Sequence, residues 1–245
     1  MNRILNFILI FCAFGVRSET YTVLVYHGAN PPYNFIANDQ QSGIFKDLFT
    51  RLGELTGHTF RLVPWSVAKG QKLFDEGKID IEPGVHPSWR VQRSVPGIYT
   101  NAYASSTEIV LGKANNAVIT DPTQLYGKIL GRVRGYRYGE FEHHFGKDKI
   151  LVYDNISEKE LLSQLRYGRV EYVMLGDTTA DYYKSTVSAY KTFKEVYKIS
   201  TLPVYMRLQP NLITLQSQLN SALNTMIKND EIKAIYARYG ASLKH

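Results

Sequence analysis

Apolar residues recur along this chain with two different periods, and each period predicts one kind of secondary structure. The apolar run over residues 21–26 predicts a first strand, and residues 59–65 predict a second. Between them, apolar residues at spacings of three and four predict an amphipathic helix over residues 44–56, closed by Gly57. A second helix is expected over residues 67–76. This alternation of strands and helices predicts a parallel α/β lobe.

The stretch that begins at Gly77 is the one around which the rest of the chain is organised. Gly77 stands where a left-handed helix cap is expected, and residues 79–82 alternate apolar and acidic side chains as in a short strand. We expect Pro83 and Gly84 to end this strand in a turn. Arg90 would then lie at the rim of a cleft, since open α/β sheets bind ligands at the carboxyl ends of their strands.

The middle of the chain predicts a second lobe. Residues 107–112 are apolar and extended, which predicts a strand that crosses to this lobe, and residues 197–208 predict a second crossing strand. Within the lobe, strands are expected over residues 128–133, 150–153 and 170–175. One helix is expected after the loop that starts at Gly135, and another is predicted from a capping box formed by Ser157 and Glu160.

The last segment, residues 212–239, has apolar residues on one helical face and a break near Asp230, so we expect two helices. Because the chain crosses between the lobes twice, the predicted fold class is α/β, with two lobes and two crossing strands as the hinge. Such a hinge permits closure around a ligand. The predicted domains are residues 19–110 with 206–245 for lobe one, and residues 111–205 for lobe two.

The first 18 residues predict a secretory signal peptide, cleaved after Ser18. They combine Arg3 with an apolar run from Ile4 to Val16 and end in small residues. A retained N-terminal anchor is the alternative interpretation. The single cysteine, Cys12, lies in this segment, so the mature chain would contain no disulfide. We expect the bacterial periplasm as the compartment.

Charge and motifs limit the possible functions. The formal net charge is +7, and Arg3 and Arg17 contribute two of these charges, so the mature chain would carry +5. The excess is spread along the chain, which weakly favours anionic ligands and gives no sign of nucleic-acid binding. No nucleophile, zinc or phosphate-loop motif is present, and no histidine or cysteine lies at metal spacing from His86. We therefore expect a protein that is not an enzyme and holds no cofactor or metal.

Several short motifs follow one another in a recognisable order. They are Pro-Pro-Tyr at 31–33, Gly-Ile-Phe-Lys-Asp-Leu at 43–48, Trp65, Gly-Lys-Ile-Asp-Ile at 77–81 with Gly84, Tyr99, Gly-Arg-Val-Glu at 168–171 and Ile-Tyr-Ala-Arg-Tyr-Gly at 235–240. Over residues 21–240 the chain resembles the family 3 periplasmic solute-binding proteins, which bind polar amino acids for ABC importers. The resemblance implies the two-lobed type II periplasmic binding protein fold, a monomer, and an ABC permease in the inner membrane as partner.

The resemblance also implies roles for three residues. Arg90 matches the family's arginine that binds the α-carboxylate, a role suited to the planar guanidinium. Tyr33 matches the aromatic ring that stacks on the ligand. Asp177 matches the acid that holds the α-ammonium group. Each has a structural alternative: Arg90 paired with Glu82, Tyr33 packed in the core, and Asp177 as the N-cap of a helix over residues 178–180.

Further candidates surround these three. Arg93 is the second choice for the carboxylate contact. Of the small hydroxyl residues that usually precede the arginine, only Ser88 remains, and His86 beside it is another candidate for ligand contact. Trp65 would either wall the pocket or pack in the core.

Tyr136 and Arg137 lie where we expect a helix N-terminus, whose free N–H groups attract anions. Arg137 would add a second positive charge, which suits an acidic ligand. A solvated loop is the alternative interpretation of this segment.

The sequence therefore predicts reversible capture of a small polar solute, an amino acid above all, for delivery to an ABC importer. Two alternatives remain open. One is a periplasmic enzyme of the same fold, similar to a dehydratase, that uses His86 or Glu82. The other is a sensing lobe that reports ligand binding to a receptor.

Overall fold

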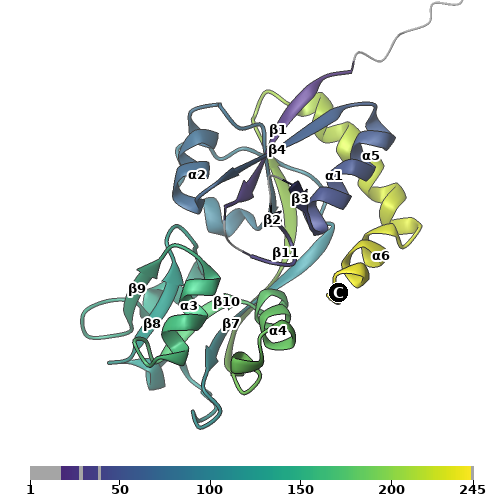
Figure 1. The fold of residues 1–245 in the computed structure, drawn as a ribbon. Helices are drawn as coiled ribbons and strands as arrows, with labels where there is room; N and C mark the ends of the chain where they lie inside the picture. Colours follow the sequence, from purple (N-terminus) through teal and green to yellow (C-terminus); the bar gives the residue numbers. More distant parts are fainter. Residues whose placement is uncertain (1–17, 28–29, 38–39, 244–245) are drawn as a thin grey trace, which may run out of the picture.

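The computed structural model describes residues 18–27, 30–37 and 40–243. Two lobes are joined by two long antiparallel strands, β7 (Ala104–Gly112) and β11 (Lys194–Leu208), which are the predicted crossing strands (Figure 1). Among the described residues, no helix has both the length and the apolar character that a membrane crossing requires. Apart from Ser18, the predicted signal peptide lies outside this part of the chain.

One twisted sheet runs through both lobes, in the order β4-β1-β5-β11-β7-β10-β8-β9, with β6 also paired to β11. In lobe one the strands are β1 (Thr20–Tyr26), β4 (Thr59–Trp65), β5 (Ile81–Val85) and β6 (Ile98–Tyr99), and in lobe two β8 (Ile129–Val133), β9 (Leu151–Asn155) and β10 (Tyr172–Gly176). A separate hairpin pairs β2 (Phe35–Ala37) with β3 (Gln40–Ser42). β1 runs parallel to β4 and β5, as predicted.

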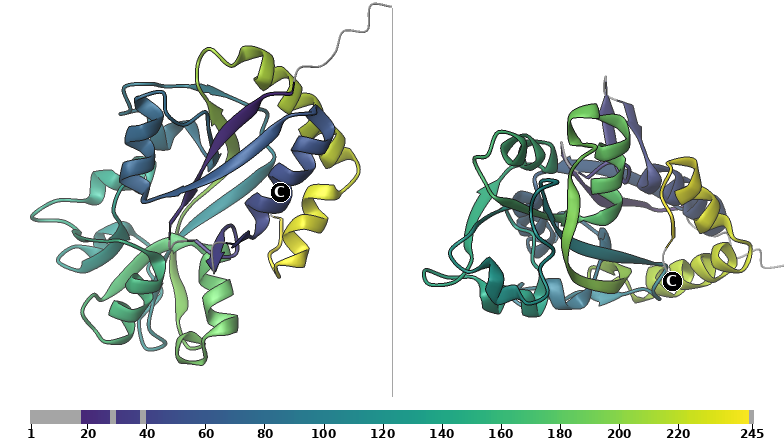
Figure 2. Two further views of the ribbon diagram at one scale, coloured as in Figure 1. Left: turned by 45° about the horizontal axis from the view of Figure 1, so that its top comes forward. Right: turned by 90° about the horizontal axis from the view of Figure 1, so that it is seen from below.

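Helices cover both faces of the sheet in lobe one. They are α1 (Ile44–Thr56), α2 (Val67–Asp75), α5 (Ile213–Lys228) and α6 (Glu231–Arg238). Side chains of β1 alternate between the faces: Val23 and Val25 are buried in the core that includes α1 and α5, whereas Leu24 packs with α2. Figure 2 shows α1, α5 and α6 grouped on one side of the lobe. The predicted break between the last helices is confirmed at Asp230, whose φ is +56°.

Lobe two has α3 (Glu158–Arg166) and α4 (Asp177–Thr186) as its α-helices, and buries a cluster of apolar side chains on each face of its sheet. Val173 and Leu175 of β10 enter one cluster and Met174 enters the other. Ser157 caps α3 by accepting a hydrogen bond from the backbone N–H of Glu160, at 3.3 Å. The predicted lobe boundaries fall within the two crossing strands or close to their ends, and they stay a prediction.

Two local expectations were wrong. The first concerns Pro83 and Gly84, which do not end the strand but lie within β5. A proline fits here because the pairing of β5 with β11 is irregular: its register shifts between Tyr205 and Arg207, opposite this point. The turn comes later, as the 3₁₀-helix η1 (Pro87–Arg90).

The second concerns the loop after Gly135, where no α-helix forms. Only a 3₁₀-helix, η3 (Gly139–His144), follows, and Gly135 and Gly139 have φ values of +95° and +57°. The Glu142 carboxylate accepts the Tyr138 backbone N–H at 2.9 Å, which holds the chain in a tight turn. The expected α-helix N-terminus, with its free N–H groups for an anion, is therefore missing at this point of the described chain.

Candidate functional site

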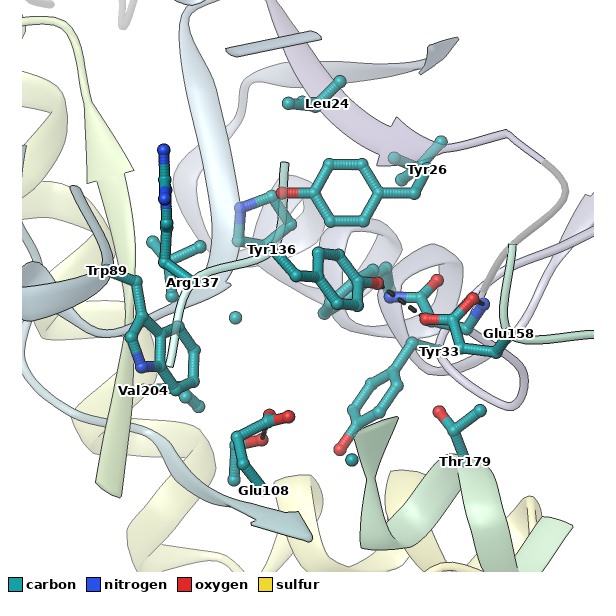
Figure 3. Close-up of a pocket in the computed structure, with 18 of the residues that line it drawn as sticks. Leu24, Tyr26, Tyr33, Trp89, Glu108, Tyr136, Arg137, Glu158, Thr179 and Val204 are labelled. Carbon is teal, nitrogen blue, oxygen red and sulfur yellow. Dashed lines mark hydrogen bonds between the residues drawn. The ribbon is translucent and has the colours of Figure 1, made fainter. Parts of the chain in front are cut away.

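A cavity of about 90 Å³ lies between the lobes, close to the crossing strands. It is reached by the carboxyl ends of strands from both lobes, which is where open α/β sheets place their ligands. Its polar wall is formed by Tyr26, Asn30, Tyr33 and Arg90 from lobe one, by Ser106 and Glu108 from β7, and by Tyr136, Arg137, Glu158 and Thr179 from lobe two (Figure 3).

Arg90 lines this cavity, but its guanidinium is bound to Glu82. Nε of Arg90 lies 3.0 Å from Glu82 Oε2 and Nη2 lies 2.7 Å from Oε1, with both side chains buried. Nη1 donates to the Trp89 carbonyl at 2.9 Å, and Nη2 donates to the Tyr26 hydroxyl at 3.2 Å. A guanidinium has five N–H groups, so one N–H on Nη1 is left without a partner among the described residues.

Glu82 is held by a second arginine. Arg207 of β11, which is fully buried, places Nη1 3.0 Å from Glu82 Oε2, and the Tyr26 hydroxyl donates to Oε1 at 2.8 Å. Burial alone would raise the pKa of Glu82, but the guanidinium groups of Arg90 and Arg207 and the Tyr26 hydroxyl hold it at about 2. A carboxylate this acidic is a poor general base near neutral pH, which argues against Glu82 as a catalytic residue.

Several predicted contacts lie beside the cavity, in a neighbouring groove of about 960 Å³. Arg93 lines this groove and forms an ion pair with Asp75. His86 and Ser88 line it too, and His86 Nδ1 accepts the backbone N–H of Ser88 at 3.2 Å, which caps η1. Burial lowers the pKa of His86. Trp65, at 42 % exposure, lines neither the cavity nor the groove.

Tyr33 packs in the core and also lines the cavity, and its stacking on a ligand stays a prediction. Its ring packs against those of Phe45 and Tyr236, at centroid distances of 5.4 and 6.1 Å, and also lines the cavity. Burial raises the pKa of its hydroxyl to about 12, so it stays neutral.

Asp177 is the first residue of α4, and Gly176 rather than Asp177 is the N-cap. The Asp177 carboxylate is buried and accepts the backbone N–H of Thr178 at 2.5 Å. Gly176 and Thr179 line the cavity on either side of it. Asp177 itself is not part of the lining.

Two cavity carboxylates, Glu108 and Glu158, were missed in the sequence. Burial raises the pKa of Glu108 to about 7, and the charges of Asp177 and Glu158 add to this shift. Burial likewise raises the pKa of Glu158. Glu108 is a lone acid within the apolar run 107–112, and that contrast is a signal that points to a functional role.

The lobes contact each other around the cavity. Glu158 of α3 accepts the Tyr136 hydroxyl at 2.7 Å and, from the other lobe, the backbone N–H of Asn30 at 3.1 Å. Gln71 of α2 donates to the Gly135 carbonyl at 3.2 Å, and the rings of Tyr26 and Tyr136 lie 5.9 Å apart. The structure therefore represents a closed arrangement of the two lobes.

The wall between cavity and groove is shared. Trp89, Tyr136 and Arg137 line both spaces, so movement of these side chains would open the cavity to the groove. Arg137 forms an ion pair with Glu142 at 3.1 Å and its side chain is 44 % exposed. In the described part of the chain, no group of three histidine, cysteine or acidic side chains is placed to hold a metal ion.

Comparison with models of protein families matches residues 23–242 to the bacterial extracellular solute-binding proteins, family 3. The chain belongs to this family. This membership confirms the resemblance seen in the sequence. It shows that the chain has a solute-binding fold and that its family consists of extracellular proteins. A comparison with curated proteins finds no significant match.

Several solved structures share the fold over nearly the whole chain. An ancestral arginine-binding protein bound to arginine has 21 % identity and a TM-score of 0.75, covering 91 % of this chain and 99 % of that one. A histidine kinase sensor domain similar to periplasmic binding proteins has 17 % identity, a TM-score of 0.77, and coverages of 92 % and 98 %. An ancestral amino-acid-binding precursor of cyclohexadienyl dehydratase has 18 % identity, a TM-score of 0.74, and coverages of 90 % and 95 %. These likenesses establish the predicted type II periplasmic binding protein fold.

Proposed function

We propose that this protein captures a small polar solute, an amino acid or a closely related amine, in the cavity between its lobes. It would then deliver the solute from the periplasm to an ABC permease in the inner membrane. The observation that carries this proposal is the cavity itself, which is lined by polar side chains from both lobes and from crossing strand β7. Membership of family 3 supports it.

Binding and closure are coupled in this proposal. A solute in the cavity touches Tyr33 and Arg90 on one lobe and Tyr136 on the other, so it gains its full set of contacts only when the lobes are closed. A ligand that prefers the closed state shifts the population toward that state. The closed form is the one that the permease would recognise.

The ligand contacts of individual residues remain proposals. Arg90 would offer its remaining N–H to a carboxylate, and Tyr33 would present its ring. Asp177 lies directly behind the cavity wall, so its contact with an ammonium group requires a shift at the start of α4.

A thermal-shift screen of the mature protein against amino acids, amines and small organic acids tests the proposal. Ligand at about one hundred times its dissociation constant stabilises the folded state by roughly 2.7 kcal/mol. For a chain of this size, that corresponds to a rise in melting temperature of roughly 5 to 10 °C. The proposal would be contradicted if the melting temperature of folded protein, freed of carried-over ligand, rose with none of these solutes.

Two other functions share this fold. The sensor alternative is favoured by the likeness to a histidine kinase sensor domain, and the enzyme alternative by the likeness to a precursor of a dehydratase. Incubating the identified ligand with the protein and following it by NMR separates the enzyme from a binding protein, because only an enzyme consumes the ligand. Co-purification with permease subunits separates transport from sensing.

A further inference from the structure

The charges around the cavity are unevenly compensated. Arg90 is neutralised by Glu82, and Arg137 is paired with Glu142. In contrast, neither Glu108 nor Glu158 forms an ion pair with any of the described residues. The cavity therefore has carboxylates in excess of free cations.

The two carboxylates differ in how well they are already satisfied. Glu158 accepts hydrogen bonds from the Tyr136 hydroxyl of its own lobe and from the Asn30 backbone of the other lobe, so both of its oxygens already have a partner. Among the residues that the structure describes, Glu108 accepts a hydrogen bond from the Ser106 hydroxyl alone, at 3.1 Å. A partly buried carboxylate without a positive partner carries a desolvation cost, which a cation in the cavity would offset.

The surroundings of Glu108 favour a cation. Figure 3 shows its carboxylate beneath the space bounded by the rings of Trp89, Tyr33 and Tyr136. Aromatic faces carry partial negative charge and attract ammonium and guanidinium groups. Trp89 lines the cavity and is 9 % exposed, and its Nε1–H has no hydrogen-bond partner among the described residues.

We propose that Glu108 receives the side-chain ammonium or guanidinium group of the solute, in addition to any α-ammonium group, and that the solutes are therefore organic cations such as basic amino acids and their amines. This assignment rests on the proposed function and narrows it. The Trp89 and Arg90 N–H groups would take an acceptor atom elsewhere on the same solute. Neutral and acidic amino acids have no side-chain cation for Glu108, and their only positive group is the α-ammonium.

Isothermal titration calorimetry at pH 8, on mature protein freed of ligand, tests the assignment with compounds matched in shape. The cations are arginine, lysine and agmatine, the neutral partners are citrulline and glutamine, and the acid is glutamate. At least one cation should bind about tenfold or more tightly than every neutral or acidic compound, since hydrogen bonds between charged groups contribute more than neutral ones. Glu108→Gln should remove this preference.

Glu195→Gln is the matched control, because Glu195 is an exposed acid on the other crossing strand. It should leave the affinities unchanged. If a neutral or acidic solute binds best, or if Glu108→Gln binds the cation as tightly as the wild type, the assignment is wrong while the proposed function stands. If none of the six compounds binds and the wider screen is also silent, both fail.

A second readout needs no variant. The affinity of the wild type for the cation should fall as the pH drops from 8 to 5, because Glu108 then takes up a proton. An affinity that is constant over this range would also overturn the assignment. Other titratable groups that face Glu108 are Asp177 on α4, Glu158 on α3, Tyr33, Tyr136 and Tyr138.

Discussion

Glu82 and Arg90 form a buried ion pair with two short contacts, Nε–Oε2 at 3.0 Å and Nη2–Oε1 at 2.7 Å. The pair joins β5 to the turn that follows it, and Arg207 of β11 forms a second ion pair with Glu82. The arginine that the family resemblance assigns to the ligand therefore also builds the wall of the ligand cavity. Loss of its side chain would affect both binding and stability.

Arg90→Ala should lower the free energy of unfolding by about 3 kcal/mol or more, because it leaves a buried carboxylate with one arginine instead of two. Urea denaturation at pH 7 measures this. Lys78→Ala is the control: Lys78 pairs with Glu76 at an exposed site, so its loss should cost less than about 1 kcal/mol. Equal urea midpoints for the two variants would contradict the structural role of Arg90.

Glu108 should make stability fall as the pH rises. Burial, with the charges of Asp177 and Glu158, raises its pKa from 4.5 to about 7, so the folded protein holds this proton more tightly than the unfolded chain. The stabilisation is complete below pH 4.5 and is lost as the pH rises through 7, by up to about 3 kcal/mol.

Glu108→Gln should remove this dependence, so that the variant is more stable than the wild type at pH 8 in the absence of ligand. Melting temperatures at pH 5 and pH 8 for the wild type, Glu108→Gln and the Glu195→Gln control measure the difference. If Glu108→Gln loses as much stability between these pH values as the wild type does, another group is responsible for the pH dependence.

Gly135→Ala should disfavour closure. A Cβ at Gly135 would lie 3.0 Å from Val67 Cγ1 and 3.2 Å from the Ala68 backbone nitrogen, both on the other lobe. Gly127→Ala is a matched control, since its φ is also positive, at +76°, but a Cβ there meets nothing within 4 Å. Both variants carry the backbone strain, of roughly 1 to 2 kcal/mol. Only Gly135→Ala should also weaken ligand binding, about tenfold or more, as measured by calorimetry.

Tyr136→Phe should weaken closure indirectly. It removes the hydroxyl that, within lobe two, holds the Glu158 carboxylate at 2.7 Å, and this carboxylate accepts the Asn30 backbone N–H from lobe one. We expect a faster ligand off-rate and an affinity lower by up to about tenfold, because a carboxylate that Tyr136 no longer positions forms a weaker hydrogen bond with Asn30. Tyr126→Phe removes a hydroxyl that contacts His144 away from the cavity and should change neither quantity. Stopped-flow fluorescence compares the two, and equal off-rates would exclude this role for Tyr136.

Sequence periodicity predicted the regular elements of lobe one well. The helix over residues 44–56 and the strand over residues 59–65 have the predicted bounds. Periodicity fails where tertiary contacts decide the backbone. Pro83 stays in a strand because its neighbour strand is irregular there, and the segment after Gly135 is held in a tight turn by the Glu142 side chain.

The site was harder to predict than the fold. Arg90, Tyr33, Tyr136 and Arg137 were expected near the ligand, and all four line the cavity. The sequence offered Glu82 as the alternative partner of Arg90, and the structure contains this pair. The sequence did not reveal that Arg207 of β11 would bind the same carboxylate. Glu158 lies in the first turn of a helix, where the sequence predicts only the cap formed by Ser157 and Glu160. Its position at the cavity depends on how the lobes close, which the sequence does not show.

Glu108 belongs to a strand that connects the lobes, where it lies opposite Ser200 of β11 and Gly176 of β10. Atoms near a pivot are displaced little when the bodies on either side rotate. The carboxylate is therefore in place before closure, whereas Tyr136 arrives only with the second lobe. In the proposed capture, the cation therefore binds Glu108 first, and the contacts with lobe two form afterwards in a step whose rate does not depend on solute concentration.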